Sequence, residues 1–158
     1  MNSALDTQAY SDFCRGSVKV KESVQLSDRV ILPLIILAEL QAGFQVGNKG
    51  RENERVLKRF LARHRVDVIN PDGETTHHYG RLFLQLKTQG TPIPTNDLWI
   101  AALVQQHNLV LESDDSHFDY LPQLNRYRGE EEGSKDCRGD RGDSPARSQS
   151  FRREGSTR

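Results

Sequence analysis

Short apolar runs alternate with longer segments of helical periodicity along the first 128 residues of this chain. Four of the short runs are aliphatic and stop at a polar residue or Pro, as strands do, and they cover residues 4–5, 30–32, 66–69 and 109–111. Because helical segments separate these runs, the pattern predicts a three-layer α/β/α sandwich with a central, mostly parallel sheet.

Four of the helical segments matter for the later argument. Residues 34–44 are so apolar that we expect a buried helix. Residues 51–64 have the spacing of an amphipathic helix, and residues 74–88 predict another, with Phe83 among its inward residues. Residues 97–107 predict a fourth.

Apolar residues become rare after residue 128, where Gly, Ser, Arg and acidic residues dominate. Such a segment buries too little surface to offset the entropy of ordering. We therefore expect a folded domain at residues 1–128 and a disordered C-terminal tail at residues 129–158.

Composition excludes several classes of protein. The chain has 22 basic and 22 acidic residues, so it is not a strongly basic nucleic-acid binder, and any contact with nucleic acid must be local. Its two cysteines lack a metal-type spacing, which fits a reducing cytosol. The start has no signal-peptide pattern, and no apolar run approaches the ~20 residues of a spanning helix. We expect a cytoplasmic protein without membrane contact.

Four acidic residues stand within an apolar segment or where one begins or ends. Glu39 is the only charged residue in residues 30–44, and burying a lone carboxylate is unfavourable unless a cation, a metal or a raised pKa offsets it. Asp6 and Asp115 follow two predicted strands, and Asp97 opens a helix. Ligands bind beyond the carboxyl ends of strands in open α/β sheets, so the fold would gather these acids at one edge, as a divalent cation requires.

Each acid also has a structural alternative. Asp6 would cap the helix that follows it, Asp97 would favour the positive end of its helix, and Asp115 would be a turn residue. Glu39 would pair with a distant Arg. The functional hypothesis therefore depends on the joint placement of the four.

The chain resembles a known family at these same positions. The segments LDTQAYSDF, LPLIILAELQAGF, IPTNDLWIAA and LESDDSHFDYLP together resemble a PIN domain of the VapC toxin type over residues 4–124. The resemblance implies a PIN-like fold and a Mg²⁺- or Mn²⁺-dependent endoribonuclease toxin that acts on RNA. It also implies a homodimer and a cognate antitoxin protein that inhibits it.

The family's four site acids carry over to Asp6, Glu39, Asp97 and Asp115. On this basis Asp6, Asp97 and Asp115 would hold the metal, and Glu39 would ligate it or orient the attacking water. Thr7 and Asn96 would support the site or contact phosphate, although both would equally serve as helix caps, as would Thr95.

The chain departs from the family pattern at two places near these acids. Gln8 stands where Asn is usual, and Ser113-Asp114 replaces Thr-Arg, which leaves open whether Asp114 or Asp115 is the ligand. A catalytically degenerate PIN domain that binds RNA or protein is therefore the alternative function. A phosphoacceptor domain ranks below both, because an Asp-x-Asp pair near the first strand is absent.

Overall fold

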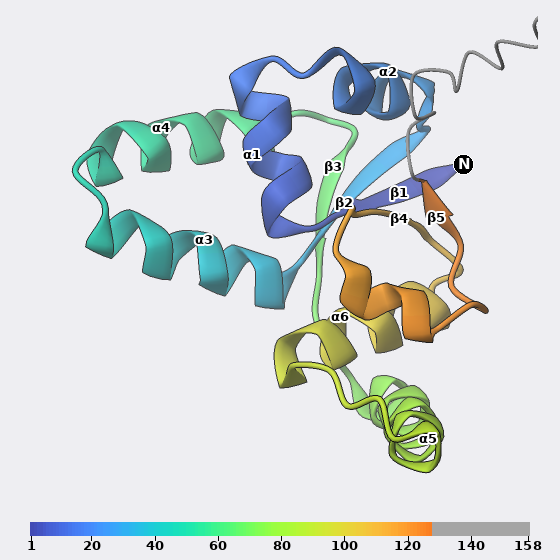
Figure 1. Cartoon of the computed structure of the whole chain (residues 1–158). Helices are drawn as coiled ribbons and strands as arrows, with labels where there is room; N and C mark the ends of the chain where they lie inside the picture. Colours follow the sequence, from blue (N-terminus) through green and yellow to red (C-terminus); the bar gives the residue numbers. More distant parts are fainter. Residues whose placement is uncertain (128–158) are drawn as a thin grey trace, which may run out of the picture.

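The computed structural model describes residues 1–127, and its centre is a five-stranded parallel sheet (Figure 1). The strands are β1 Asn2–Leu5, β2 Arg29–Pro33, β3 Val66–Ile69, β4 Val110–Glu112 and β5 Arg126–Tyr127, in the order β3-β2-β1-β4-β5. All four pairings are parallel. The predicted α/β class is confirmed, whereas the tail predicted at residues 129–158 lies outside the described residues.

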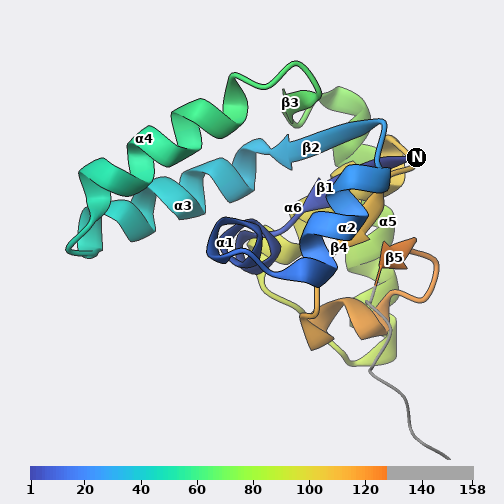
Figure 2. The same cartoon turned by 90° about the horizontal axis from the view of Figure 1, so that it is seen from above.

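Helices cover both faces of this sheet. They are α1 Thr7–Arg15, α2 Val18–Leu26, α3 Leu34–Val46, α4 Gly50–Leu61, α5 Gly73–Gln89 and α6 Thr95–Gln106, with a short 3₁₀ helix, η1, at Ser116–Tyr120. Figures 1 and 2 show α1 and α2 on one face and α5 and α6 on the other, which is the expected three-layer arrangement. The α3–α4 hairpin projects beyond the end of β2.

The buried helix of the core is α6, not α3. Six residues of α6, from Leu98 to Val104, are buried, and they lie on all sides of the helix. In α3 only Ile36 and Leu40 are buried, and Leu34 is 43% exposed, which corrects the expectation for residues 34–44. The reason is that α3 projects away from the sheet, so only one of its faces meets the core. No helix in the described part of the chain is long and apolar enough to cross a membrane.

The chain reverses its direction of winding at β1. It passes from β1 outward through β2 to β3, and later returns to the other side of β1 through β4 and β5. The carboxyl ends of β1 and β4 therefore lie side by side where the connections diverge. Such a switch point is the usual ligand site of an open α/β sheet.

Glu112, the last residue of β4, is a buried carboxylate outside this ligand site. It is 3% exposed and accepts a short hydrogen bond from the hydroxyl of Ser23 on α2. Burial raises the pKa of Glu112, and hydrogen bonds from Ser23 and Ser3 and the charge of Lys19 oppose the rise. The net shift means that keeping Glu112 ionised destabilises the folded state.

Glu112→Gln is expected to stabilise the protein at alkaline pH and to have little effect in acid. A carboxyl group whose folded-state pKa is raised destabilises the fold above that pKa, and the effect vanishes below the unfolded value near 4.5. Thermal unfolding at pH 8 and at pH 4 would measure the difference, with Glu22→Gln, at an exposed position, as the control. Equal effects at both pH values would contradict the prediction.

Candidate functional site

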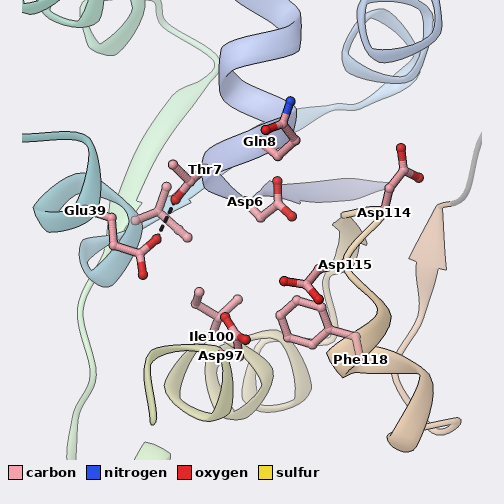
Figure 3. Close-up of a pocket in the computed structure, with 10 residues that line it drawn as sticks. Asp6, Thr7, Gln8, Glu39, Asp97, Ile100, Asp114, Asp115 and Phe118 are labelled. Atoms are coloured by element: carbon pink, nitrogen blue, oxygen red, sulfur yellow. Dashed lines mark hydrogen bonds between the residues drawn. The ribbon is translucent and has the colours of Figure 1, made fainter. Parts of the chain in front are cut away.

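A pocket of about 420 Å³ opens beyond the carboxyl ends of β1 and β4 (Figure 3). Ten residues line it, namely Asp6, Thr7, Gln8, Ile36, Glu39, Asp97, Ile100, Asp114, Asp115 and Phe118. The structure thus brings all four sequence-predicted acids together, with Asp114 as a fifth carboxylate. None of these lining residues, all from the described part of the chain, is Lys or Arg. Like charges at such close quarters favour a bound cation.

Asp6 is the most buried of these acids. It directly follows β1, is 7% exposed and accepts a hydrogen bond of 2.6 Å from the backbone N–H of Ala9, so it also caps α1. Burial raises the pKa of Asp6, the charges of Asp115 and Asp114 add to the rise, and hydrogen bonds from Ala9 and Ser113 oppose it. The capping alternative therefore holds, and the same carboxylate still faces the pocket.

Glu39 has polar partners in the structure, although its neighbours in the sequence are apolar. It is half-buried, and its carboxylate accepts hydrogen bonds from Thr7 Oγ1 at 2.5 Å and from Asn96 Nδ2 at 2.8 Å. Partial exposure and two neutral donors, rather than an Arg, account for its presence in α3. Figure 3 shows the bond from Thr7 crossing between α1 and α3.

Thr7 and Asn96 do not cap their helices, contrary to the structural alternative. Asp6 caps α1, and α6 begins at Thr95 with Pro94 in the capping position and no side-chain cap. The helix therefore starts two residues before the predicted Asp97. This earlier start places Asn96 inside the first turn, where its amide reaches Glu39.

Asp97 and Asp115 meet at the ring of His117. His117 Nδ1 lies 3.0 Å from Asp97 Oδ2 and 3.0 Å from Asp115 Oδ1. Burial raises the pKa of Asp97, Asp115 and Glu39 add to the rise, and His117 opposes it. One ligand atom from each of the three residues falls within 4.8 Å of the others, a spacing that one metal ion can bridge.

The two neighbouring acids after β4 point in different directions. Both carboxylate oxygens of Asp114 lie 3.0 Å from Lys19 Nζ, so a cation already pairs with this side chain. Asp115 instead accepts a hydrogen bond of 2.9 Å from the backbone of His117 and faces Asp97. Figure 3 shows Asp114 directed away from the other acids. This geometry favours Asp115 as the ligand.

Arg126 on β5 holds the loop that carries Asp115. Its side chain is 7% exposed and donates to the backbone carbonyl oxygens of Ser113 at 2.9 Å and Asp115 at 2.8 Å. It also pairs with Asp119 at 2.6 Å, and its guanidinium lies 5.6 Å from the ring centroid of Phe118. No sequence pattern predicts this role, because the acceptors are backbone carbonyl oxygens, which every residue has.

The donor set fits a hard divalent cation. Carboxylate oxygens are the ligands that Mg²⁺ prefers and that Mn²⁺ accepts. Here they come from α3, from α6, from the junction of β1 and α1, and from the loop after β4. Burial and the neighbouring acids raise the pKa values of Asp6 and Asp97, so the pocket by itself disfavours their ionised forms. A cation at this place would remove that unfavourable term.

Comparisons with known proteins agree on one family. The PIN domain family matches residues 4–124. Ribonuclease VapC2 of Rickettsia felis is 31% identical over 104 residues, which are 65% of this chain and 76% of that protein. Ribonuclease VapC1 of Haemophilus influenzae strain R2866 is 36% identical over 85 residues, which are 54% of this chain. The match spans 62% of the length of that relative.

Solved structures show the same fold. The structure of VapBC2 from Rickettsia felis, bound to a DNA fragment from its promoter, superposes with a TM-score of 0.72 and 27% identity. That match covers 80% of this chain and 98% of the other. VapBC-1 from nontypeable Haemophilus influenzae gives a TM-score of 0.69 and 30% identity, over 80% of this chain and 97% of that one.

Proposed function

Because the chain belongs to the PIN domain family and resembles its VapC members, we propose that it is a Mg²⁺- or Mn²⁺-dependent endoribonuclease. In this proposal it is the toxin of a VapBC-like toxin–antitoxin pair. One observation carries the proposal: Asp6, Glu39, Asp97 and Asp115 line one pocket at the switch point of a parallel sheet. We also propose that residues 1–128 form the nuclease domain.

Residues in and beside the pocket have three roles in this proposal. Asp6, Asp97 and Asp115 would hold the cation, which would activate water and offset the charge that develops on the phosphate. Glu39 would orient the attacking water or complete the ligand set. Thr7 and Asn96 fix the Glu39 carboxylate through their two hydrogen bonds, as supporting residues do around metal ligands.

Exposed apolar side chains support the proposed protein partners. Leu34 and Val46 on α3 are 43% and 89% exposed, and Phe83 and Leu84 on α5 are 52% and 64% exposed. Exposed apolar side chains are available for contact with a partner protein. Structures of relatives named VapBC support a toxin–antitoxin pair, and we propose in addition that the chain forms a homodimer and acts in the cytoplasm.

The test is cleavage of a mixed RNA substrate by the purified chain. We expect cleavage with Mg²⁺ or Mn²⁺, none with EDTA, and recovery when the metal is returned. RNA fragments would be resolved on a denaturing gel. A folded protein that binds Mn²⁺ but leaves every RNA intact would favour the catalytically degenerate alternative. Cleavage that persists in EDTA would contradict the metal dependence.

A further inference from the structure

His117 is a nitrogen donor between two of the pocket carboxylates, and its side chain is 41% exposed. Its Nδ1 atom is shielded from solvent and lies 3.0 Å from one oxygen of Asp97 and 3.0 Å from one oxygen of Asp115. We infer that His117 is a direct ligand of the metal, together with Asp97 and Asp115, and that it biases the site toward Mn²⁺ over Mg²⁺. The inference deepens the proposed function and rests on it.

The spacing of the three donors is that of ligands on one ion. In an octahedral site with ligand distances of about 2.1 Å, neighbouring ligand atoms lie about 3.0 Å apart. The two distances from His117 Nδ1 have this value, and the three donors fall within 4.8 Å of one another. The side chains need little movement to accept an ion.

The backbone around His117 holds its ring in this place. The His117 N–H donates to Asp115 Oδ1 at 2.9 Å, which is the same oxygen that the ring nitrogen approaches. Phe118 follows and is 2% exposed, and Arg126 donates to the carbonyl oxygen of Asp115. A ligand fixed in advance by packing and backbone bonds loses little entropy when the ion binds.

The chemistry of the donor atom determines which metal the site binds more tightly. Mg²⁺ takes oxygen ligands almost exclusively, whereas imidazole nitrogen suits first-row transition metals, and Mn²⁺ accepts both kinds of donor. A site with two carboxylates and one imidazole thus favours Mn²⁺ more than a site of carboxylates alone. The alternative role of His117 is that of a hydrogen-bonding partner to Asp97 and Asp115, without contact to the ion.

Electron paramagnetic resonance of bound Mn²⁺ separates these two roles. With Mn²⁺ alone, we expect the wild-type chain to show the electron spin-echo modulation of a directly bound imidazole ¹⁴N. His117→Asn should abolish this signal, and His77→Asn, at an exposed position on α5, should retain it. Calorimetry should show a loss of Mn²⁺ affinity of about tenfold or more in His117→Asn, with a much smaller change for Mg²⁺.

Three results would overturn the inference. They are a wild-type Mn²⁺ complex without ¹⁴N modulation, a signal that survives His117→Asn, and no binding of Mn²⁺ by wild type. The first and third need no variant, so they hold even where a substitution impairs folding. RNA cleavage is measured separately. Modulation from ¹⁴N without cleavage would refute only the proposed nuclease activity. Metal-dependent cleavage without ¹⁴N modulation would refute only the proposal that His117 is a metal ligand.

Discussion

Asp97→Asn is expected to lower RNA cleavage by about 10³-fold, because a catalytic metal supplies several kcal/mol of transition-state stabilisation and each ~1.4 kcal/mol is a factor of ten. Asp97 is one of the three proposed metal ligands, and an amide is a weaker and uncharged donor. The helix should still form, since the Asp97 side chain does not cap α6, although the substitution removes the acidic residue of its first turn. Initial rates at saturating Mn²⁺ would measure the loss.

The same substitution is expected to stabilise the metal-free protein at neutral pH. Burial and the charges of Asp115 and Glu39 raise the pKa of Asp97 more than His117 lowers it. The ionised form therefore destabilises the fold above the raised pKa, and this term disappears below the unfolded value of 3.8. Asp97→Asn should therefore stabilise the protein at pH 7 but not at pH 3.5. Added Mn²⁺ should raise the melting temperature of wild type much more than that of Asp97→Asn.

Asp67→Asn is the matched control, because Asp67 lies on β3 and pairs with Arg29 outside the pocket. It should cleave RNA as wild type does and should respond to Mn²⁺ as wild type does. Equal cleavage by wild type and Asp97→Asn would mean that a contaminating nuclease is active or that the metal ligands are assigned wrongly.

The gathering of the four acids could be predicted because strand order and chain direction determine it. Asp6 comes directly after one apolar run, and Asp115 follows another after three polar residues. The carboxyl ends of parallel strands share one edge of a sheet. The prediction that Asp97 and Glu39 join them also depended on the spacing of the site acids in the PIN domain family. The fold class followed from the same alternation of strands and helices.

The parts of the site that could not be predicted depend on orientation. His117 stands two residues after Asp115 in the sequence, but only the packing of η1 near α6 turns its Nδ1 toward Asp97. Arg126 acts on backbone carbonyl oxygens, and Lys19 reaches Asp114 from 95 positions away. None of these contacts produces a periodic or local pattern in the sequence.

Burial was predicted less well than secondary structure. An apolar run shows that a segment avoids water, but not how much of the protein surrounds it. Thus α3 projects from the sheet with Leu34 exposed, and Phe83, expected to face inward, is 52% exposed. The hydrophobic pattern of one chain does not distinguish an apolar residue at the surface from one in the core.

Phe118→Ala is expected to destabilise the fold by about 3–5 kcal/mol, a large part of the roughly 5–15 kcal/mol that holds a domain together. The Phe118 ring is 2% exposed, lines the floor of the acidic pocket and lies beneath the guanidinium of Arg126. Truncation leaves a cavity there and removes the packing that fixes η1. Urea unfolding would measure the change.

The substitution should also impair the site while the protein is still folded. Asp115 caps η1 and His117 lies within it, so both depend on its position. Mn²⁺ affinity should therefore fall in Phe118→Ala under conditions where circular dichroism shows intact structure. Phe118→Leu keeps an apolar side chain and should lose less than about 1.5 kcal/mol. Phe83→Ala removes the same ring from an exposed position and should stay within about 0.5 kcal/mol of wild type. If Phe118→Ala were destabilised yet bound Mn²⁺ as wild type does, the core would support the fold without positioning the ligands. The rigidity of the site would then have to come from Arg126 and from the hydrogen bonds within the loop.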